Sequence, residues 1–99
     1  TRNTKVYTII EKLKNYGCEI EVSDYWAHKK DIREDIQLKD LKDLKEQDAL
    51  VIAVNHSVYS KFQLSDIKKI LKKGGVVIDV KSVFDKNYFK GSEFTHWRL

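Results

Sequence analysis

Gly75-Val-Val-Ile-Asp-Val-Lys81 is the segment of this chain that says most about its architecture. An apolar, β-branched run that follows glycine is typical of a strand buried on both faces of a parallel sheet. In open α/β sheets, the ends of such strands carry ligand-binding groups. Because side chains alternate along a strand, we expect Asp79 and Lys81 to share one face. The segment therefore predicts a core strand that ends in a charged pair beside a crevice.

The first third of the chain predicts a helix followed by a strand. Apolar residues recur at helical spacing over residues 6–13, which predicts an amphipathic helix that Gly17 ends. Residues 18–23 alternate between apolar and polar, which predicts a strand that ends at Asp24. Residues 25–37 are polar and weakly patterned, so we expect a loop there, with or without a helical turn near Asp31–Asp35.

The remaining patterns continue this alternation of helices and strands. In chain order they predict a short helix at 41–44 capped by Asp40, a strand at 49–54, a helix at 64–71 stopped by Gly74-Gly75, a strand at 76–80, a loop or short helix at 82–90, and a strand at 94–99. Such alternation indicates a mostly parallel sheet with helices packed on it. We therefore expect a Rossmann-like three-layer α/β domain. A doubly wound unit normally opens on a strand, so a chain that opens on a helix predicts that the first strand is lacking.

Composition and charge restrict the class of protein. The 99 residues are enough for one domain, and 41% apolar with 34% charged residues is an ordinary soluble balance. No apolar run is long enough to cross a bilayer, so no membrane partner is expected. The net charge is +4, but bases alternate with acids, which favours solvated helix surfaces over a nucleic-acid footprint. The chain starts at Thr1 and has no methionine, so we expect it to be cut from a longer protein.

Several side chains have both a functional and a structural interpretation. Asp24 stands where a Rossmann strand often ends in a ribose-binding acid, but no Gly-x-Gly-x-x-Gly precedes it, which favours a loop or cap role. His56 follows a predicted strand, where it could donate to a phosphate or, as we favour, hold a loop. For Lys81, contact with a substrate and a surface ion pair with Asp79 are equally open.

Other candidate residues favour plain structural roles. The single cysteine, Cys18, excludes an internal disulfide and indicates a reducing, cytoplasmic compartment, and we expect its side chain to pack in the core. We expect Trp26 and Trp97 to be packing or interface residues, because bases and aromatic residues do not interleave as in an RNA-binding surface. No metal site is expected, because the three histidines lack ligand spacing; they are His28, His56 and His96.

Five segments, in order along the whole chain, resemble the C-terminal domain of the UDP-glucose/GDP-mannose dehydrogenase family. They are Arg2-Asn-Thr-Lys5, Gly17-Cys-Glu-Ile-Glu-Val-Ser-Asp24, Asp48-Ala-Leu-Val-Ile-Ala-Val-Asn-His56, Lys72-Lys-Gly-Gly-Val-Val-Ile-Asp-Val-Lys81 and Trp97-Arg-Leu99. The resemblance is closest to the bacterial branch that acts on UDP-N-acetylhexosamines for surface-polysaccharide synthesis. The chain departs from the family in having Asp24-Tyr25 where Asp-Pro is common, so the shape of that loop is not carried over.

The resemblance implies a known chemistry. Family enzymes oxidise the sugar C6 alcohol to a carboxylate in two NAD-linked steps through a cysteine thiohemiacetal. They consist of an N-terminal NAD-binding domain, a helical middle and a C-terminal nucleotide-sugar-binding domain, which residues 1–99 would form. The catalytic cysteine lies in the parts absent here and is not Cys18, so the chain alone should be inactive. A UDP-sugar substrate, NAD held mainly by the N-terminal domain, and a homo-oligomeric full-length enzyme are likewise implied.

Two site residues follow from the resemblance. Arg2 resembles the family's arginine that contacts NAD across the domain cleft, and a guanidinium suits a diphosphate because its fork of donors binds two oxygens. Lys81 resembles the base at the nucleotide-sugar site, where it would act as a point charge on a sugar carboxylate or a phosphate. The alternative function is a stand-alone Rossmann-like interaction or regulatory module without catalytic activity. A nucleic-acid binder ranks last.

Overall fold

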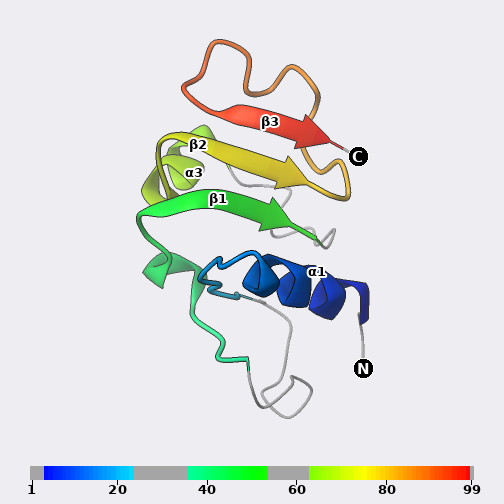
Figure 1. Cartoon of the computed structure of the whole chain (residues 1–99). Helices are drawn as coiled ribbons and strands as arrows, with labels where there is room; N and C mark the ends of the chain where they lie inside the picture. The colour runs from blue at the N-terminus through cyan, green and yellow to red at the C-terminus, as the bar shows by residue number, and fades with distance from the viewer. Residues whose placement is uncertain (1–3, 24–35, 54–62, 99) are drawn as a thin grey trace. The chain divides into compact units, whose positions relative to one another are not determined.

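The computed structural model of this chain describes residues 4–23, 36–53 and 63–98. These residues belong to two compact units, Thr1–Leu44 and Lys45–Leu99. Figure 1 colours the first unit from blue to green and the second from green to red. Within the described ranges, no helix is long and apolar enough to cross a membrane.

The first unit opens with helix α1, Thr4–Asn15. Its predicted apolar face is confirmed, because Ile10 is buried and the neighbouring apolar side chains are half-buried; these are Val6, Ile9 and Leu13. Gly17 ends the helix as predicted, with a positive φ of 91° that suits glycine. Its N–H donates to the Lys14 carbonyl at 2.9 Å, and the following N–H donates to the Leu13 carbonyl at 3.0 Å. Both bonds satisfy carbonyls at the end of the helix, as in a Schellman motif.

The predicted strand at 18–23 is wrong. Among the described residues of this unit, pairing is limited to one isolated parallel bridge between Val22 and Leu38, with Lys39 N–H donating to the Val22 carbonyl at 2.9 Å. A strand requires a ladder, and a single bridge does not make one. The predicted core position of Cys18 is also wrong, since its thiol is exposed in the turn that closes α1.

The short helix predicted after Asp40 is present as the 3-10 helix η2, Leu41–Asp43. Asp40 occupies the N-cap position, but its side chain makes no capping hydrogen bond. Its backbone carbonyl instead accepts the Asp43 N–H at 2.9 Å. The prediction is therefore right for the position of the helix and wrong for the capping side chain. Most of the loop predicted at 25–37 lies outside the described residues.

The second unit contains a three-stranded parallel sheet, which confirms the predicted α/β class. Its strands are β1 (Gln47–Ile52), β2 (Leu71–Asp79) and β3 (Thr95–Arg98), in the order β1-β2-β3. The expected strand at 76–80 forms the central ladder, since Val76–Asp79 pairs with β1 on one side and β3 on the other. In Figure 1 the three arrows point the same way. The predicted strands at 49–54 and 94–99 are confirmed in position with shifted ends.

The prediction that Gly74-Gly75 stops the second helix is wrong. Helix α3, Leu64–Ile70, ends where Leu71 adopts an extended backbone, with φ −94° and ψ 143°. Both glycines instead lie inside β2, next to a shift in its register with β1. Gly74 has a φ of 80°, and a Cβ on Gly75 would meet the Asp48 carbonyl oxygen at 3.3 Å. The pair therefore permits an irregular, closely packed start to the strand. Lys72 and Lys73 also lie in β2.

One face of the sheet is buried and forms the core of this unit. The register places Leu50 beside Val77 and Ile52 beside Asp79 on that face. Helix α3 and the turns that replace the predicted loop or short helix at 82–90 supply the rest of the cluster. Its buried members are Ile52, Ile67, Leu71, Val77, Phe84, Phe89 and Phe94. The core therefore lies directly beneath the segment that follows β2, and it positions the candidate site.

Candidate functional site

The three parallel strands end at one edge of the sheet. Ile52 pairs with Asp79, and Asp79 pairs with Arg98, so the last residues of β1, β2 and β3 are in register. Open α/β sheets bind ligands beyond the carboxyl ends of their strands. This carboxyl edge is therefore the part of the described chain where a ligand site is expected.

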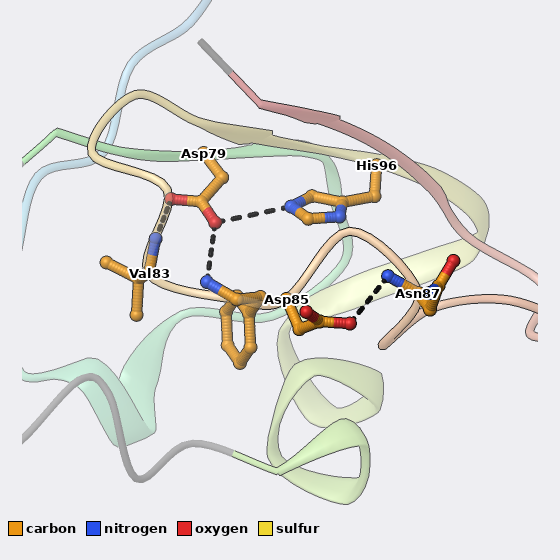
Figure 2. A network of polar contacts seen from close by, with 6 residues as sticks. Asp79, Val83, Asp85, Asn87 and His96 are labelled. Atoms are coloured by element: carbon orange, nitrogen blue, oxygen red, sulfur yellow. Dashed lines mark hydrogen bonds and ion pairs between the residues drawn. The ribbon is translucent and has the colours of Figure 1, made fainter.

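Asp79 is the organising residue of this edge. Its side chain is fully buried, which is unusual for a carboxylate unless donors surround it. Oδ1 accepts the Val83 N–H at 2.7 Å, and Oδ2 accepts the Phe84 N–H at 2.8 Å. Figure 2 shows the carboxylate bridging these two successive amides. Asp79 thus serves as the acceptor for two successive backbone amides of the segment that follows β2.

Lys81 lies in the turn that follows Asp79 and is exposed. The predicted sharing of one strand face by Asp79 and Lys81 is wrong, because β2 ends at Asp79 and the alternation ends with it. The described part of the chain also gives Lys81 no ion pair with Asp79, whose oxygens face backbone amides and His96. The turn therefore separates the two charges, burying the acid and exposing the base.

The backbone holds this turn at both ends. Val80 N–H donates to the Ile52 carbonyl at 2.9 Å, which ties the start of the turn to β1. Ser82 N–H donates to the Asp79 carbonyl at 3.3 Å, and Ser82 has a φ of 53°. A serine in the left-handed region is uncommon and persists where its surroundings determine the conformation. Lys81 is consequently fixed between two anchored residues.

His96, from the neighbouring strand β3, completes the polar network. Its side chain is only 5% exposed, and its Nε2 lies 3.2 Å from Asp79 Oδ2. The centroid of the imidazole lies 4.7 Å from that of the Phe89 ring. The imidazole also packs edge-on against the Phe84 ring, with 6.3 Å between the two centroids. Sequence reasoning missed this role, since it considered His96 only as a metal ligand. The signal was the alternation of the last strand, because Phe94 is apolar and His96 follows at the same phase.

The arrangement leaves the acid unavailable for chemistry and the base available. Among the described residues, no buried side-chain nitrogen or oxygen lacks a hydrogen-bond partner. Asp79 therefore cannot serve as an exposed base or ligand. Lys81 and Arg98, both exposed, place positive charge at the carboxyl edge. Such an edge can bind an anionic group, with Lys81 acting as a point charge.

The other predicted site residues are not all part of this arrangement. Arg2, Asp24, Trp26 and His56 lie outside the described residues. The Trp97 side chain is 62% exposed on β3, so it does not pack in the core of this unit. Within the described ranges, no three His, Cys, Asp or Glu side chains converge as metal ligands would.

Comparison with known families matches residues 1–86 of the chain to the UDP-glucose/GDP-mannose dehydrogenase family, UDP binding domain. The chain belongs to this family. The predicted resemblance is therefore confirmed, and the matched range includes β1, β2 and the turn that carries Lys81.

Relatives with curated names agree with this assignment. Protein CapL of Staphylococcus aureus is 36% identical over 100 residues, which cover 99% of this chain and 23% of CapL. UDP-N-acetyl-D-glucosamine 6-dehydrogenase of Salmonella typhi is 26% identical over 83% of this chain and 20% of its own length. UDP-N-acetyl-D-mannosamine dehydrogenase of Methanococcus aeolicus is 29% identical over 95% of this chain and 21% of its own length. The chain thus spans about a fifth of the length of these relatives. No solved structure gives a significant match.

Proposed function

We propose that this chain is the nucleotide-sugar-binding part of an NAD-dependent UDP-sugar 6-dehydrogenase that serves surface-polysaccharide synthesis. The family match to a UDP binding domain and the names of two relatives, which act on UDP-N-acetylhexosamines, support the substrate class. The structural observation that carries the proposal is the anchored turn that exposes Lys81 at the carboxyl edge of the sheet.

Lys81 supplies the contact with the nucleotide sugar. An ammonium group at this edge attracts a diphosphate or a sugar carboxylate without imposing a fixed geometry. Because Asp79 is buried and its oxygens are engaged, it does not neutralise that charge by a surface ion pair. The energy of binding this remote handle would position the sugar for oxidation elsewhere in the enzyme.

NAD belongs to another part of the enzyme in this proposal. The chain has no Gly-x-Gly-x-x-Gly, and its one glycine pair lies inside β2, not in a strand-to-helix turn. The chain thus lacks the glycine fingerprint of a dinucleotide site, and we assign that site to another part of the enzyme. Arg2 would reach NAD from this side of the cleft, and NAD would accept the hydride when bound. The catalytic cysteine would also lie elsewhere, so residues 1–99 alone would be inactive.

The setting of the enzyme is part of the same proposal. One free cysteine and no disulfide partner for it fit a reducing compartment, and we assign the enzyme to the cytoplasm. We also expect the full-length enzyme to be a homo-oligomer.

The test is an assay of NADH formation by the full-length protein that carries this chain, with a panel of UDP-sugars. We expect oxidation of a UDP-N-acetylhexosamine. Lys81→Gln should raise KM for the nucleotide sugar about tenfold, because a hydrogen bond to a charged group is lost. Lys86→Gln is the matched control, since Lys86 is exposed on the same segment after β2. Absence of NADH with every UDP-sugar would reject the proposal and favour a stand-alone binding module.

A further inference from the structure

We propose that Asp79 and His96 form a positioning pair that fixes the turn carrying Lys81 and so sets the affinity of the sheet edge for the diphosphate of the nucleotide sugar. This inference rests on the proposed function for its ligand. It adds a role for two residues that make no contact with the ligand themselves. Both would act through Lys81.

The geometry of the turn shows why it needs a side chain that accepts hydrogen bonds from its backbone. Ser82 has a left-handed backbone, a sparsely populated conformation for a residue with a side chain. Next to it, the N–H groups of Val83 and Phe84 point to one carboxylate. Without an acceptor there, two neighbouring amides would face the interior unpaired, and the turn would open to hydrate them. The Asp79 carboxylate therefore selects the observed conformation.

His96 in turn holds the carboxylate. Oδ2 already accepts the Phe84 N–H, and an imidazole with Nε2 protonated donates to the same oxygen. The ring is held against Phe84 and Phe89, so its direction is set by packing. Because His96 belongs to β3, this contact joins the turn after β2 to the adjacent strand. The Asp79 carboxylate is thus held both by the backbone amides of the segment after β2 and by His96 on β3.

The consequence for binding is one of preorganisation. A lysine on a flexible loop must become ordered when the ligand binds, and the conformational entropy lost in that ordering weakens affinity. Lys81 needs less ordering, because both neighbouring residues are hydrogen-bonded through their backbones. Val80 is bonded to β1 and Ser82 to Asp79. Loosening the pair should therefore weaken ground-state binding of the nucleotide sugar and leave the chemical step unchanged.

The experiment compares three variants in the full-length protein. His96→Leu removes the donor, and His96→Gln restores one near the position of Nε2. Thr95→Val is the matched control, because Thr95 is exposed on the same strand with its side chain on the opposite face. Two quantities are measured: KM and kcat with the UDP-sugar, and hydrogen exchange of the Val83 and Phe84 amides by mass spectrometry.

We expect His96→Leu to raise KM about three- to tenfold with kcat within about twofold, and to speed exchange of both amides. His96→Gln should recover most of the loss, and Thr95→Val should match the wild type. A merely structural role would lower the active fraction, which reduces apparent kcat and leaves KM unchanged.

Two results would overturn the inference, and a third separates it from the proposed function. Unchanged KM in His96→Leu beside a raised KM in Lys81→Gln would show that the pair does not set affinity. Unchanged amide exchange in His96→Leu would show that it does not hold the turn. A wild-type protein that oxidises no UDP-sugar would instead reject the proposed function and the diphosphate with it, while amide exchange alone would still decide whether the pair fixes the turn.

Discussion

Replacement of Asp79 by asparagine tests the central contact of the site. The side chain keeps its shape, but one carboxylate oxygen becomes an NH2 group. In one orientation that group faces the Val83 N–H, and in the other it faces the Phe84 N–H. Either way, one buried backbone donor loses its acceptor. An unsatisfied buried donor costs about 1–3 kcal/mol, and loss of charge assistance in the remaining bonds adds about 1 kcal/mol. We expect Asp79→Asn to lower the free energy of unfolding by about 2–4 kcal/mol.

Urea unfolding of the 99-residue chain, followed by tryptophan fluorescence, measures this loss. With a urea dependence of about 1–2 kcal/mol per molar for a chain of this size, a loss of about 2–4 kcal/mol should lower the midpoint by about 1–4 M. Asp85→Asn is the matched control. Asp85 lies in the same segment and accepts the Asn87 N–H at 3.0 Å (Figure 2), and its side chain is exposed. Because water can replace that bond, the control should change stability by less than about 0.5 kcal/mol.

Equal midpoints for the two variants would refute the reasoning. That result would mean that the Asp79 bonds contribute no more than an exposed turn bond. A variant that is already unfolded in the absence of urea would mean that the loss exceeds about 4 kcal/mol or that the parent chain is less stable than the roughly 5–15 kcal/mol typical of small domains. In that event, the milder His96→Leu change should show a measurable loss of about 1 kcal/mol in the same assay.

Three further predictions concern other parts of the described chain. Gly75→Ala should destabilise the chain by about 1–3 kcal/mol in urea unfolding, because the added Cβ would meet two backbone oxygens and the Leu71 Cβ at 3.0–3.3 Å. Lys73→Ala is the control and should be nearly neutral, because Lys73 is exposed. Tyr88→Phe should cost about 1 kcal/mol in the same measurement, since the Tyr88 hydroxyl accepts the Leu64 N–H at 2.8 Å at the start of α3; an unchanged midpoint would mean that water replaces it. Exposed Cys18 should react with a thiol reagent in the folded chain as fast as in urea, and a protected thiol would contradict its placement.

The parallel sheet could be predicted because its signal is local. Residues 49–52 and 76–78 are apolar and mostly β-branched, and both runs lie within short segments bounded by polar residues or glycine. Alternation of helical and strand periods then determines that neighbouring strands run parallel. Helix α1 could be predicted for the same reason, since its apolar spacing and its closing glycine are contained in one stretch.

Other elements could not be predicted because tertiary contacts decide them. Gly74-Gly75 has the composition of a helix end, yet α3 stops at Ile70 and the pair accommodates the close approach of Asp48. Segment 18–23 has the alternation of a strand, but a strand forms only when a partner supplies a ladder. Local sequence does not tell which backbone will lie alongside.

The candidate site divides in the same way. Asp79 and Lys81 could be found from their place after a buried strand, but their separation could not, because it depends on where β2 ends. The contact between Asp79 and His96 spans 17 residues and requires β3 to lie beside β2 in one register. Phase along the last strand places His96 on the inner face, yet only the register brings it to the carboxylate.

Burial of Asp79 also explains how a basic edge can follow an acidic residue. At an effective dielectric constant of about 20, opposite charges about 4 Å apart attract by about 4 kcal/mol, so an exposed aspartate beside Lys81 would compete with an incoming phosphate. In this chain the carboxylate is turned inward, where two backbone amides and His96 satisfy it. At the surface, this negative charge would block the site. In the interior, it instead stabilises the turn that exposes Lys81. A cationic edge built in this way depends as much on the buried acid as on the exposed base.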